Sequence, residues 1–383
     1  MIVKRIAALL AAALLLLPGA AAAAPETESA PIPDEDRFGG RDWDAIMAEF
    51  IADHGAIPSR MGAAYYNTVT GEEHFFNGDQ YRYAASVYKL PLNMVYAERV
   101  YRGEMQMDDR IGGWHYDEMQ RLSLEYSSNS VSELLCNNLG SRQQYCEAIA
   151  AYLADDPAEL DAEFYYKCYA NSLTPKQVLC ALKKLYAAPD RYPNVLEHMK
   201  NAQQKEYFCL TERRFPIAHK YGCLLTEEAN TVNDCGIVYT DDPILIVMFT
   251  GNMPGAFRLL GDYCTLMCDY AQYTRAVRLR AEAEAEAAEQ ARLDAEAAEA
   301  AAAEKAEKAE RERLAAEKAA AEAAAAAERA RQEAESAPWA PDREERRLLY
   351  AGGAAAALCL VAAPFFWFES CRREDKTCTM END

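Results

Sequence analysis

Ser86 and Lys89 have the residue types and the spacing for nucleophilic attack on a carbonyl group. They are three residues apart at the start of an expected helix, so they share one face of it. A serine hydroxyl needs a nearby base, and Lys89 can act as that base if desolvation or nearby cations lower its pKa. The positive end of the helix dipole would stabilise negative charge that develops on the substrate.

Two further polar segments could complete such a site. Ser127 and Asn129 open a second expected helix, and Lys220 follows an expected strand. The Ser127 hydroxyl can relay a proton to a departing nitrogen, and Asn129 can bind a substrate amide or hold the first lysine. Lys220 can supply a fixed positive charge for a substrate carboxylate. Singly, each residue also fits an ordinary role as a helix cap or a solvated strand-end charge, so the hypothesis of catalysis depends on all of them together.

The order of these segments resembles the S-x-x-K, S-D-N and K-T-G motifs of class A β-lactamases and penicillin-binding proteins. The motifs here are Ser86-Val87-Tyr88-Lys89, Ser127-Ser128-Asn129 and Lys220-Tyr221-Gly222. Residues 83–85, Leu173-Thr174-Pro175 and residues 233–238 are similar to further segments of that family. The resemblance covers residues 41–275. It implies an α/β fold of the α+β sandwich type, with an antiparallel sheet formed from both ends of the domain, flanking helices and an inserted helical subdomain.

The resemblance also implies a role for each site residue. Ser86 would be the nucleophile, Lys89 its base and Ser127 the proton relay. The backbone N–H groups of Ser86 and Cys223 would form the oxyanion hole. Substrate binding would fall to Asn129, Lys220, Tyr221 and Gly222. The implied substrate is a β-lactam that passes through an acyl-serine intermediate, with no cofactor. A DD-peptidase-like enzyme on peptidoglycan stem peptides and a non-catalytic binding head on a stalk remain as alternatives.

Three departures from the family pattern bear on turnover. Ser128 stands in place of Asp in the second motif, and Tyr221 stands in place of Thr in the third, where it would crowd a carboxylate pocket. The glutamate that deacylates class A enzymes has no clear counterpart. Asp156 or Glu159 could serve, although both also fit an exposed acidic loop. Without that base, acylation could proceed while hydrolysis of the acyl-enzyme is slow.

The elements that would position these residues are expected on both sides of the helical segments. A hairpin is predicted over residues 60–76 around Thr70-Gly71, and strands are predicted over 215–219, 233–239 and 244–250. The unbroken apolar run of the last strand indicates a central position in the sheet. Helices are predicted over 86–102, 130–140, 142–153 and 174–187, and a terminal helix from Gly255 onwards.

Composition excludes other kinds of protein. The net charge of −21 argues against a nucleic-acid binder, because a phosphate backbone would be repelled. Five scattered histidines, without an HExxH or paired CxxC motif, give no indication of a metal site.

The two ends of the sequence carry apolar segments. Residues 1–24 are typical of an export signal, with an uncleaved anchor as the alternative, and residues 25–40 are predicted to be a flexible linker. Residues 348–368 hold no charge and are long enough to cross a bilayer, with a buried core helix as the alternative. Residues 337–347 would be a juxtamembrane linker and 369–383 a cytoplasmic tail. These features predict a single-pass protein of the cell membrane, with the catalytic domain outside the cytoplasm.

Residues 276–336 form an Ala/Glu-rich stretch that predicts a helical stalk. Within 281–336 there are 27 Ala, 16 acidic and 8 basic residues, and no Gly or Pro. A continuous helix there would be about 84 Å long, with disordered low-complexity chain as the alternative. Leu293 and Leu314 are too few for stable heptads, so we expect a single semi-rigid helix with at most weak self-association.

Nine cysteines lie in residues 41–275, at positions 136, 146, 168, 180, 209, 223, 235, 264 and 268. Because the number is odd, at least one thiol has no partner inside the domain. The spacing of Cys264 and Cys268 is poorly suited to a bond between them. A cysteine nucleophile formed by Cys223 and His219 is the rival catalytic hypothesis, but four residues of extended strand would separate them by roughly 13 Å.

Overall fold

The computed structural model describes residues 31–226 and 230–336. Its contacts divide the chain into two units, Met1–Ala285 and Glu286–Asp383. Of the described elements, every strand and every helix except the distal part of the last one belongs to the first unit, which carries the candidate site.

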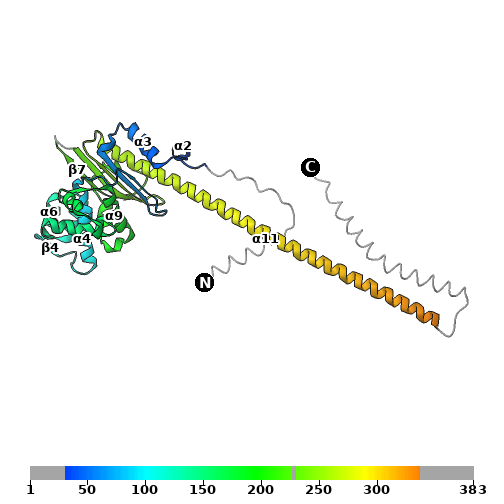
Figure 1. The fold of residues 1–383 in the computed structure, drawn as a ribbon. Coiled ribbons are helices and arrows are strands. Elements are labelled where there is room, and N and C mark those ends of the chain that lie inside the picture. The colour runs from blue at the N-terminus through cyan, green and yellow to red at the C-terminus, as the bar shows by residue number, and fades with distance from the viewer. Residues whose placement is uncertain (1–30, 227–229, 337–383) are drawn as a thin grey trace, which may run out of the picture. The chain divides into compact units, whose positions relative to one another are not determined.

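A five-stranded antiparallel sheet forms the centre of the first unit (Figure 1). Its strands, in spatial order, are β2 (Glu73–Phe76), β1 (Met61–Asn67), β9 (Ile244–Thr250), β8 (Asn230–Val238) and β7 (Ile217–Leu225). The register places Met61 opposite Thr250 and Asn67 opposite Ile244. The first hairpin therefore pairs directly with the last strand, so the expectation of a sheet formed from both ends of the domain is confirmed.

The central strand β9 is apolar from Ile244 to Phe249, because it is buried on both faces of the sheet. Leu245, Val247 and Phe249 pack into the cluster on the helical side, whereas Ile246 and Met248 pack into the cluster on the opposite side. The opposite cluster is completed by α3 (Trp43–Asp53) and by the first turns of α11 (Ala256–Ser336), which cover that face of the sheet in Figure 1.

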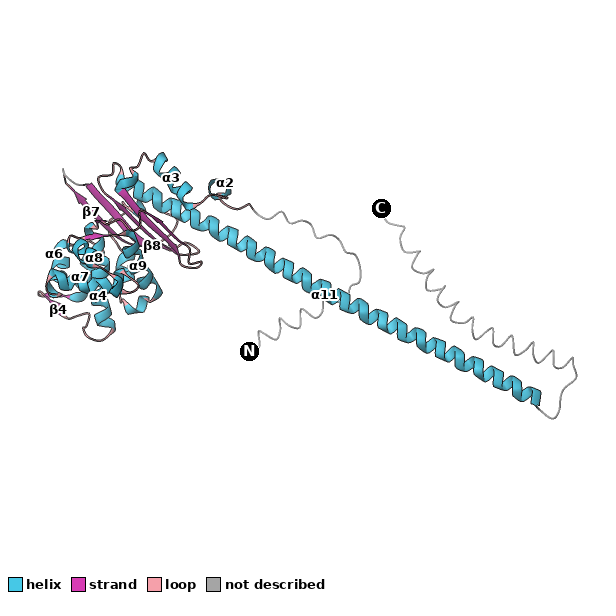
Figure 2. Cartoon of the chain, in the orientation of Figure 1, coloured by secondary structure: helices cyan, strands magenta, loops and turns pink. Residues whose placement is uncertain are grey.

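The other face carries the helical subdomain (Figure 2). Its helices are α4 (Lys89–Tyr101), α5 (Tyr116–Leu124), α6 (Asn129–Asn138), α7 (Arg142–Leu153), α8 (Ala162–Tyr169), α9 (Pro175–Ala187) and α10 (Val195–Lys200). Short pieces complete the described elements: α2 (Glu35–Phe38), β3 (Arg82–Tyr83), β4 (Arg110–Ile111), β5 (Trp114–His115) and β6 (Ser172–Leu173), and the 3₁₀ turns η1 (Pro58–Arg60), η2 (Ala85–Tyr88), η3 (Pro157–Glu159), η4 (Pro189–Arg191) and η5 (Phe208–Leu210).

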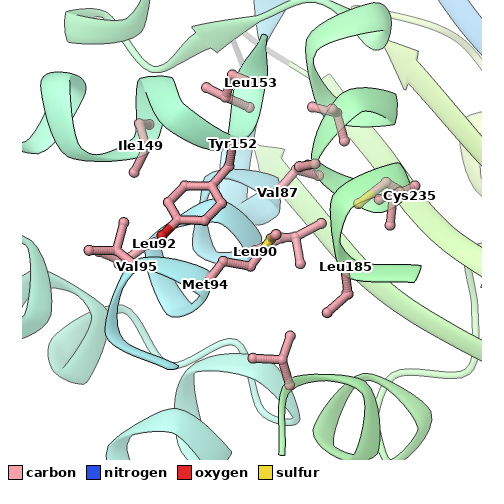
Figure 3. Packing of buried hydrophobic residues seen from close by; sticks show 14 of the residues in the cluster. Val87, Leu90, Leu92, Met94, Val95, Ile149, Tyr152, Leu153, Leu185 and Cys235 are labelled. Carbon is pink, nitrogen blue, oxygen red and sulfur yellow. The ribbon is translucent and has the colours of Figure 1, made fainter. Parts of the chain in front are cut away.

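Helix α4 is the central helix of this subdomain. Leu90, Leu92 and Met94 are fully buried, and Figure 3 shows them among side chains from α7 and α9 such as Leu153 and Leu185. The helix is apolar on nearly all sides because other elements surround it. Because α4 is packed on all sides, its position is fixed, and so is the position of its first turn, which follows Ser86.

Several predicted boundaries need correction. Strand β7 extends to Leu225, so Lys220, Tyr221 and Gly222 lie within the strand and not after it. Its final residues are paired with β8 up to Leu225 opposite Asn230, and this pairing is a long-range feature that local sequence does not encode. Ser86 lies in the 3₁₀ turn η2, and the α-helix itself begins at Lys89.

The long helix expected from composition is confirmed, since α11 runs from Ala256 to Ser336 without interruption. The terminal helix of the domain and the Ala/Glu-rich stretch are thus one helix. The apolar segments at 6–17 and 348–368 lie outside the described residues. Among the helices of residues 31–226 and 230–336, none is both long and apolar enough to span a membrane.

Candidate active site

A tight turn between the sheet and α4 presents Ser86. Ala85 has a positive φ of 48°, which turns the chain sharply before Ser86. Asn171 holds this turn from outside: its Nδ2 donates to the Ala85 carbonyl oxygen at 3.0 Å, and its own carbonyl oxygen accepts the Ala84 N–H at 2.8 Å. Ser86 itself is half-buried.

Lys89 is fully buried in the first turn of α4. Its Nζ donates to the Ser127 carbonyl oxygen at 2.6 Å and to Asn129 Oδ1 at 2.7 Å, and lies 3.3 Å from Ser127 Oγ. Burial lowers the pKa of Lys89 to about 8, because the charged ammonium loses its hydration. A lysine in this state can give up its proton near neutral pH, as a base for Ser86 requires.

Lys220 approaches the same hydroxyl from the sheet. Its Nζ donates to Ser127 Oγ at 2.9 Å and to the Tyr221 carbonyl oxygen at 2.7 Å. The side chain is fully buried, so it is not a solvated strand-end charge. Burial, together with repulsion from Lys89, lowers the pKa of Lys220 to about 7.

Ser127 therefore links the two lysines. Its φ of 55° lies in the left-handed region, which is unusual for a residue other than glycine and costs of order 1–3 kcal/mol. This conformation directs the carbonyl oxygen to Lys89 while the hydroxyl meets both ammonium groups. The structure thus brings together four of the predicted site residues: Lys89, Ser127, Asn129 and Lys220.

Gly222 allows the sheet to touch the turn that carries Ser86. A Cβ atom at this position would lie 2.5 Å from the backbone N of Ser86 and 3.1 Å from that of Val87. Only glycine permits this approach. Cys223, the second predicted oxyanion donor, follows Gly222 directly in β7.

Tyr221 lies beside Lys220, whose Nζ is 4.1 Å from the centroid of the Tyr221 ring. Its ring is 4.9 Å from that of Tyr207, and its hydroxyl donates to the Glu125 carbonyl oxygen at 3.2 Å. The Tyr221 ring thus lies next to Lys220, and it also lines a neighbouring pocket of about 490 Å³ together with Tyr126, Tyr207 and Cys223.

The two candidate deacylating carboxylates lie at the exposed turn η3. Asp156 caps it, because its Oδ1 accepts the Ala158 N–H at 2.9 Å, and Glu159 is exposed. In the described part of the chain, neither carboxylate forms a hydrogen bond or ion pair with Ser86, Lys89 or Ser127.

Sequence reasoning missed Asn171 and Tyr207. Asn171 supports the Ser86 turn but stands in an unremarkable segment, and only its position just before Leu173-Thr174-Pro175 could have drawn notice. Tyr207 lies beside the end of β7 only because the chain between α10 and β7 folds back. Within the described ranges, no three His, Cys, Asp or Glu side chains are grouped to hold a metal ion.

Comparison with known proteins agrees with this geometry. Residues 44–258 match a family described as a β-lactamase enzyme family. The match covers more than half of the chain, and the chain belongs to that family.

Solved structures resemble it in fold at low identity. A β-lactamase from Burkholderia vietnamiensis is 15% identical and has a TM-score of 0.50, covering 61% of this chain and 98% of that one. A β-lactamase from Chitinophaga pinensis is 19% identical with a TM-score of 0.49, covering 60% and 98%. A class A β-lactamase of the last common ancestor of Gram-negative bacteria is 19% identical with a TM-score of 0.49, covering 59% and 96%. The search of curated proteins gives no match.

Proposed function

We propose that this chain is a serine hydrolase in which Ser86 is acylated by β-lactams. The observation that carries the proposal is the convergence of two buried ammonium groups, from Lys89 and Lys220, on Ser127 Oγ. Burying two like charges around one hydroxyl is costly, and an arrangement of this kind is typical of a site that moves protons.

A residue can then be assigned to each step of acylation. Neutral Lys89 takes the proton from Ser86 Oγ, which attacks the β-lactam carbonyl carbon. The Ser86 and Cys223 amides hold the resulting oxyanion. Ser127 passes a proton to the ring nitrogen as the C–N bond breaks, and its hydroxyl is reprotonated from the adjacent lysines. The lysine pair keeps one positive charge at this stage, and that charge attracts the carboxylate of the substrate.

Replacing the nucleophile tests this assignment. With the full-length protein and benzylpenicillin, intact-protein mass spectrometry should show one adduct with the mass of the opened drug, mapped to the peptide that contains Ser86. Ser86→Ala removes the attacking oxygen and should give no adduct. Ser128→Ala is the matched control, because the Ser128 hydroxyl hydrogen-bonds only Ser130 among the described residues. An adduct that persists on Cys223 in Ser86→Ala would overturn the serine mechanism. No adduct on the folded wild type would favour the non-catalytic binding head.

Hydrolysis of the acyl-enzyme should be slow. Asp156 and Glu159 lie at the exposed turn η3 without a hydrogen bond to Ser86, Lys89 or Ser127, so neither of them is in place to activate water there. We expect a burst of one equivalent with a chromogenic cephalosporin, followed by turnover far below the roughly 10²–10³ s⁻¹ of efficient enzymes. Turnover in that range would show that a base has been missed.

The exposed position of Asp156 and Glu159 also supports a second candidate function, that of a DD-peptidase-like enzyme. An acyl-serine that resists water can persist until another acceptor arrives. Incubation with a peptide ending in D-Ala-D-Ala separates the two functions: release of D-alanine with a stable penicillin adduct favours the peptidase, and release of the opened drug alone favours the β-lactamase.

We also propose that the domain faces the outside of a cell membrane. The apolar composition of residues 6–17 and of 348–368 supports this location. Protease added to intact spheroplasts should release a soluble fragment that still reacts with penicillin, whereas full protection would refute the arrangement.

A further inference from the structure

A cysteine, a histidine and an aspartate form a chain of contacts away from Ser86. Cys209 lies in the turn η5, His219 in β7 and Asp234 in β8. The Cys209 Sγ is 3.6 Å from His219 Nε2, and His219 Nδ1 is 2.8 Å from Asp234 Oδ2. Nucleophile, base and orienting carboxylate thus follow one another at hydrogen-bonding distances, as activation of a thiol requires.

Asp234 is held in one orientation by three donors. Besides the imidazole, its Oδ2 accepts the Phe208 N–H at 3.1 Å and its Oδ1 accepts the Cys235 N–H at 2.9 Å. The carboxylate and the imidazole are both fully buried. Because the carboxylate only accepts, His219 Nδ1 carries a proton, and Nε2 is directed at the sulfur.

The surroundings of His219 favour the protonated, positively charged imidazole. Burial alone would lower the pKa of His219, but the charge and hydrogen bond of Asp234 outweigh it and raise that pKa to about 9. Both ring nitrogens then donate, so the Cys209 sulfur is the acceptor. An adjacent imidazolium stabilises a thiolate over a thiol.

This group lies on the face of the sheet that the Ser86 mechanism does not use. Ala218 packs into the cluster on the helical side, whereas Ile217 and Tyr221 pack into the cluster on the opposite side. By the alternation of side chains along β7, Lys220 reaches Ser127 while His219 points to the opposite face.

Among the nine cysteines of the described residues, all free, only Cys209 combines partial exposure with a cationic partner in hydrogen-bonding contact. Burial raises the pKa of Cys136 and of Cys180 to about 11, which keeps these half-buried thiols protonated. Cys223 is exposed, but its side chain has no histidine partner in the described residues.

We propose that Cys209, His219 and Asp234 form a second nucleophilic site, at which the Cys209 thiolate is oxidised by small peroxides. The sulfur attacks one oxygen of hydrogen peroxide, an S–O bond forms and the O–O bond breaks. Hydroxide leaves and takes a proton from the imidazolium or water. Sulfur is oxidised to the sulfenic acid as the peroxide is reduced. A half-buried sulfur favours so small a reagent, and the reaction needs no oxyanion hole.

The test uses the folded wild-type chain and its own Cys223 as the reference. The full-length protein is treated with hydrogen peroxide in the presence of dimedone, and labelling of each cysteine is followed by peptide mass spectrometry. Exposure alone predicts that Cys223 reacts first. Activation predicts that Cys209 reacts about tenfold faster, because a free thiol is only a few per cent ionised at neutral pH and the gain is partly offset by lower nucleophilicity. Equal rates, or a faster Cys223, would overturn the proposal.

Two variants separate this site from the serine site. His219→Gln should reduce Cys209 labelling to the rate of Cys223, and unchanged fast labelling in that variant would refute the role of the imidazole. Cys209→Ser should abolish the label at this position and leave the benzylpenicillin adduct on Ser86 intact. Ser86→Ala should retain fast labelling of Cys209, so failure of one site is distinguishable from failure of the other.

Discussion

Lys89 and Lys220 are close enough to titrate as a pair. Both side chains are fully buried and both reach Ser127 Oγ, so burial and mutual repulsion lower both pKa values, to about 8 and about 7. The apparent values belong to the pair and not to one lysine alone. Acylation requires the state of the pair in which one lysine is protonated and the other is neutral, since this state offers a free base and still carries one positive charge.

The acylation rate should therefore show a bell-shaped dependence on pH. Below about pH 7 both lysines are protonated and no base is free, and above about pH 8 both are neutral and the charge for the substrate carboxylate is lost. The rate of adduct formation with benzylpenicillin, measured from pH 5 to 10, should peak between these values. Lys220→Arg fixes one charge and should remove the falling limb. A rate that does not change with pH would contradict the role of the pair.

Gly222 offers a second test at the residue scale. Gly222→Ala would place a Cβ 2.5 Å from the Ser86 backbone N, so β7 and the turn must separate. Loss of one oxyanion donor typically costs about 10²–10³ in rate, and we expect a fall of that order in acylation. Gly251→Ala is the matched control, because a Cβ there has nothing within 4 Å. Equal rates for both variants would argue against an oxyanion hole at this contact.

The residue types of the site were predictable, but several of their partners were not. The spacing of Ser86 and Lys89 indicates a shared helix face from sequence alone. The sequence ruled out Cys223 as a partner of His219 on distance but did not indicate Cys209, which reaches the imidazole from a turn of a different segment. Such a contact depends on how the chain folds back after α10, which no local pattern encodes.

Among the elements, α4 is anchored through one buried carboxylate. Glu98 accepts hydrogen bonds from Arg191 in η4 and Tyr152 in α7, and it forms an ion pair with Arg102. Its side chain is 7% exposed. Because this helix also carries Lys89, the same contacts that join three elements keep the base in position.

Removing that carboxylate should destabilise the domain. Glu98→Ala leaves a buried hydroxyl and two guanidinium groups without their acceptor, which costs about 1–3 kcal/mol in free energy of unfolding. Glu104→Ala, on a side chain that is 55% exposed, should change it by less than about 0.5 kcal/mol. Urea denaturation followed by circular dichroism compares the two. A loss for Glu98→Ala as small as that of the control would show that α4 is held by apolar packing alone.

Elements with strong local signals were predicted well. The capping box of Thr174 and Gln177 starts α9 where the sequence placed it, and the apolar run of β9 is central as expected. The short helices α5, α8 and α10 were not predicted, because helices of six to nine residues are stabilised by tertiary contacts more than by propensity. The extension of β7 to Leu225 likewise depends on its pairing with β8.

At the scale of the whole chain, amino-acid composition predicts that a long helix is present, but it does not predict where that helix begins. Alanine, glutamate, lysine and arginine favour helix so strongly that the distal part of α11 follows from residue types alone. The change in composition predicts a domain end at residue 275 and a stalk from 276, and α11 runs through both positions without interruption. A change in composition within one helix marks no break in backbone geometry.

The pairing of β1 with β9 has a consequence for synthesis. Met61 emerges from the ribosome long before its partner Thr250, so β1 must wait while nearly the whole domain is translated. During that interval one edge of the first hairpin has open backbone groups, and unpaired strand edges recruit other chains. Closing so long a loop also slows the pairing itself. Nascent chains released before Ile244 therefore cannot complete the sheet, and any cell that makes this protein has to keep the first hairpin from associating with its neighbours until the last strand arrives.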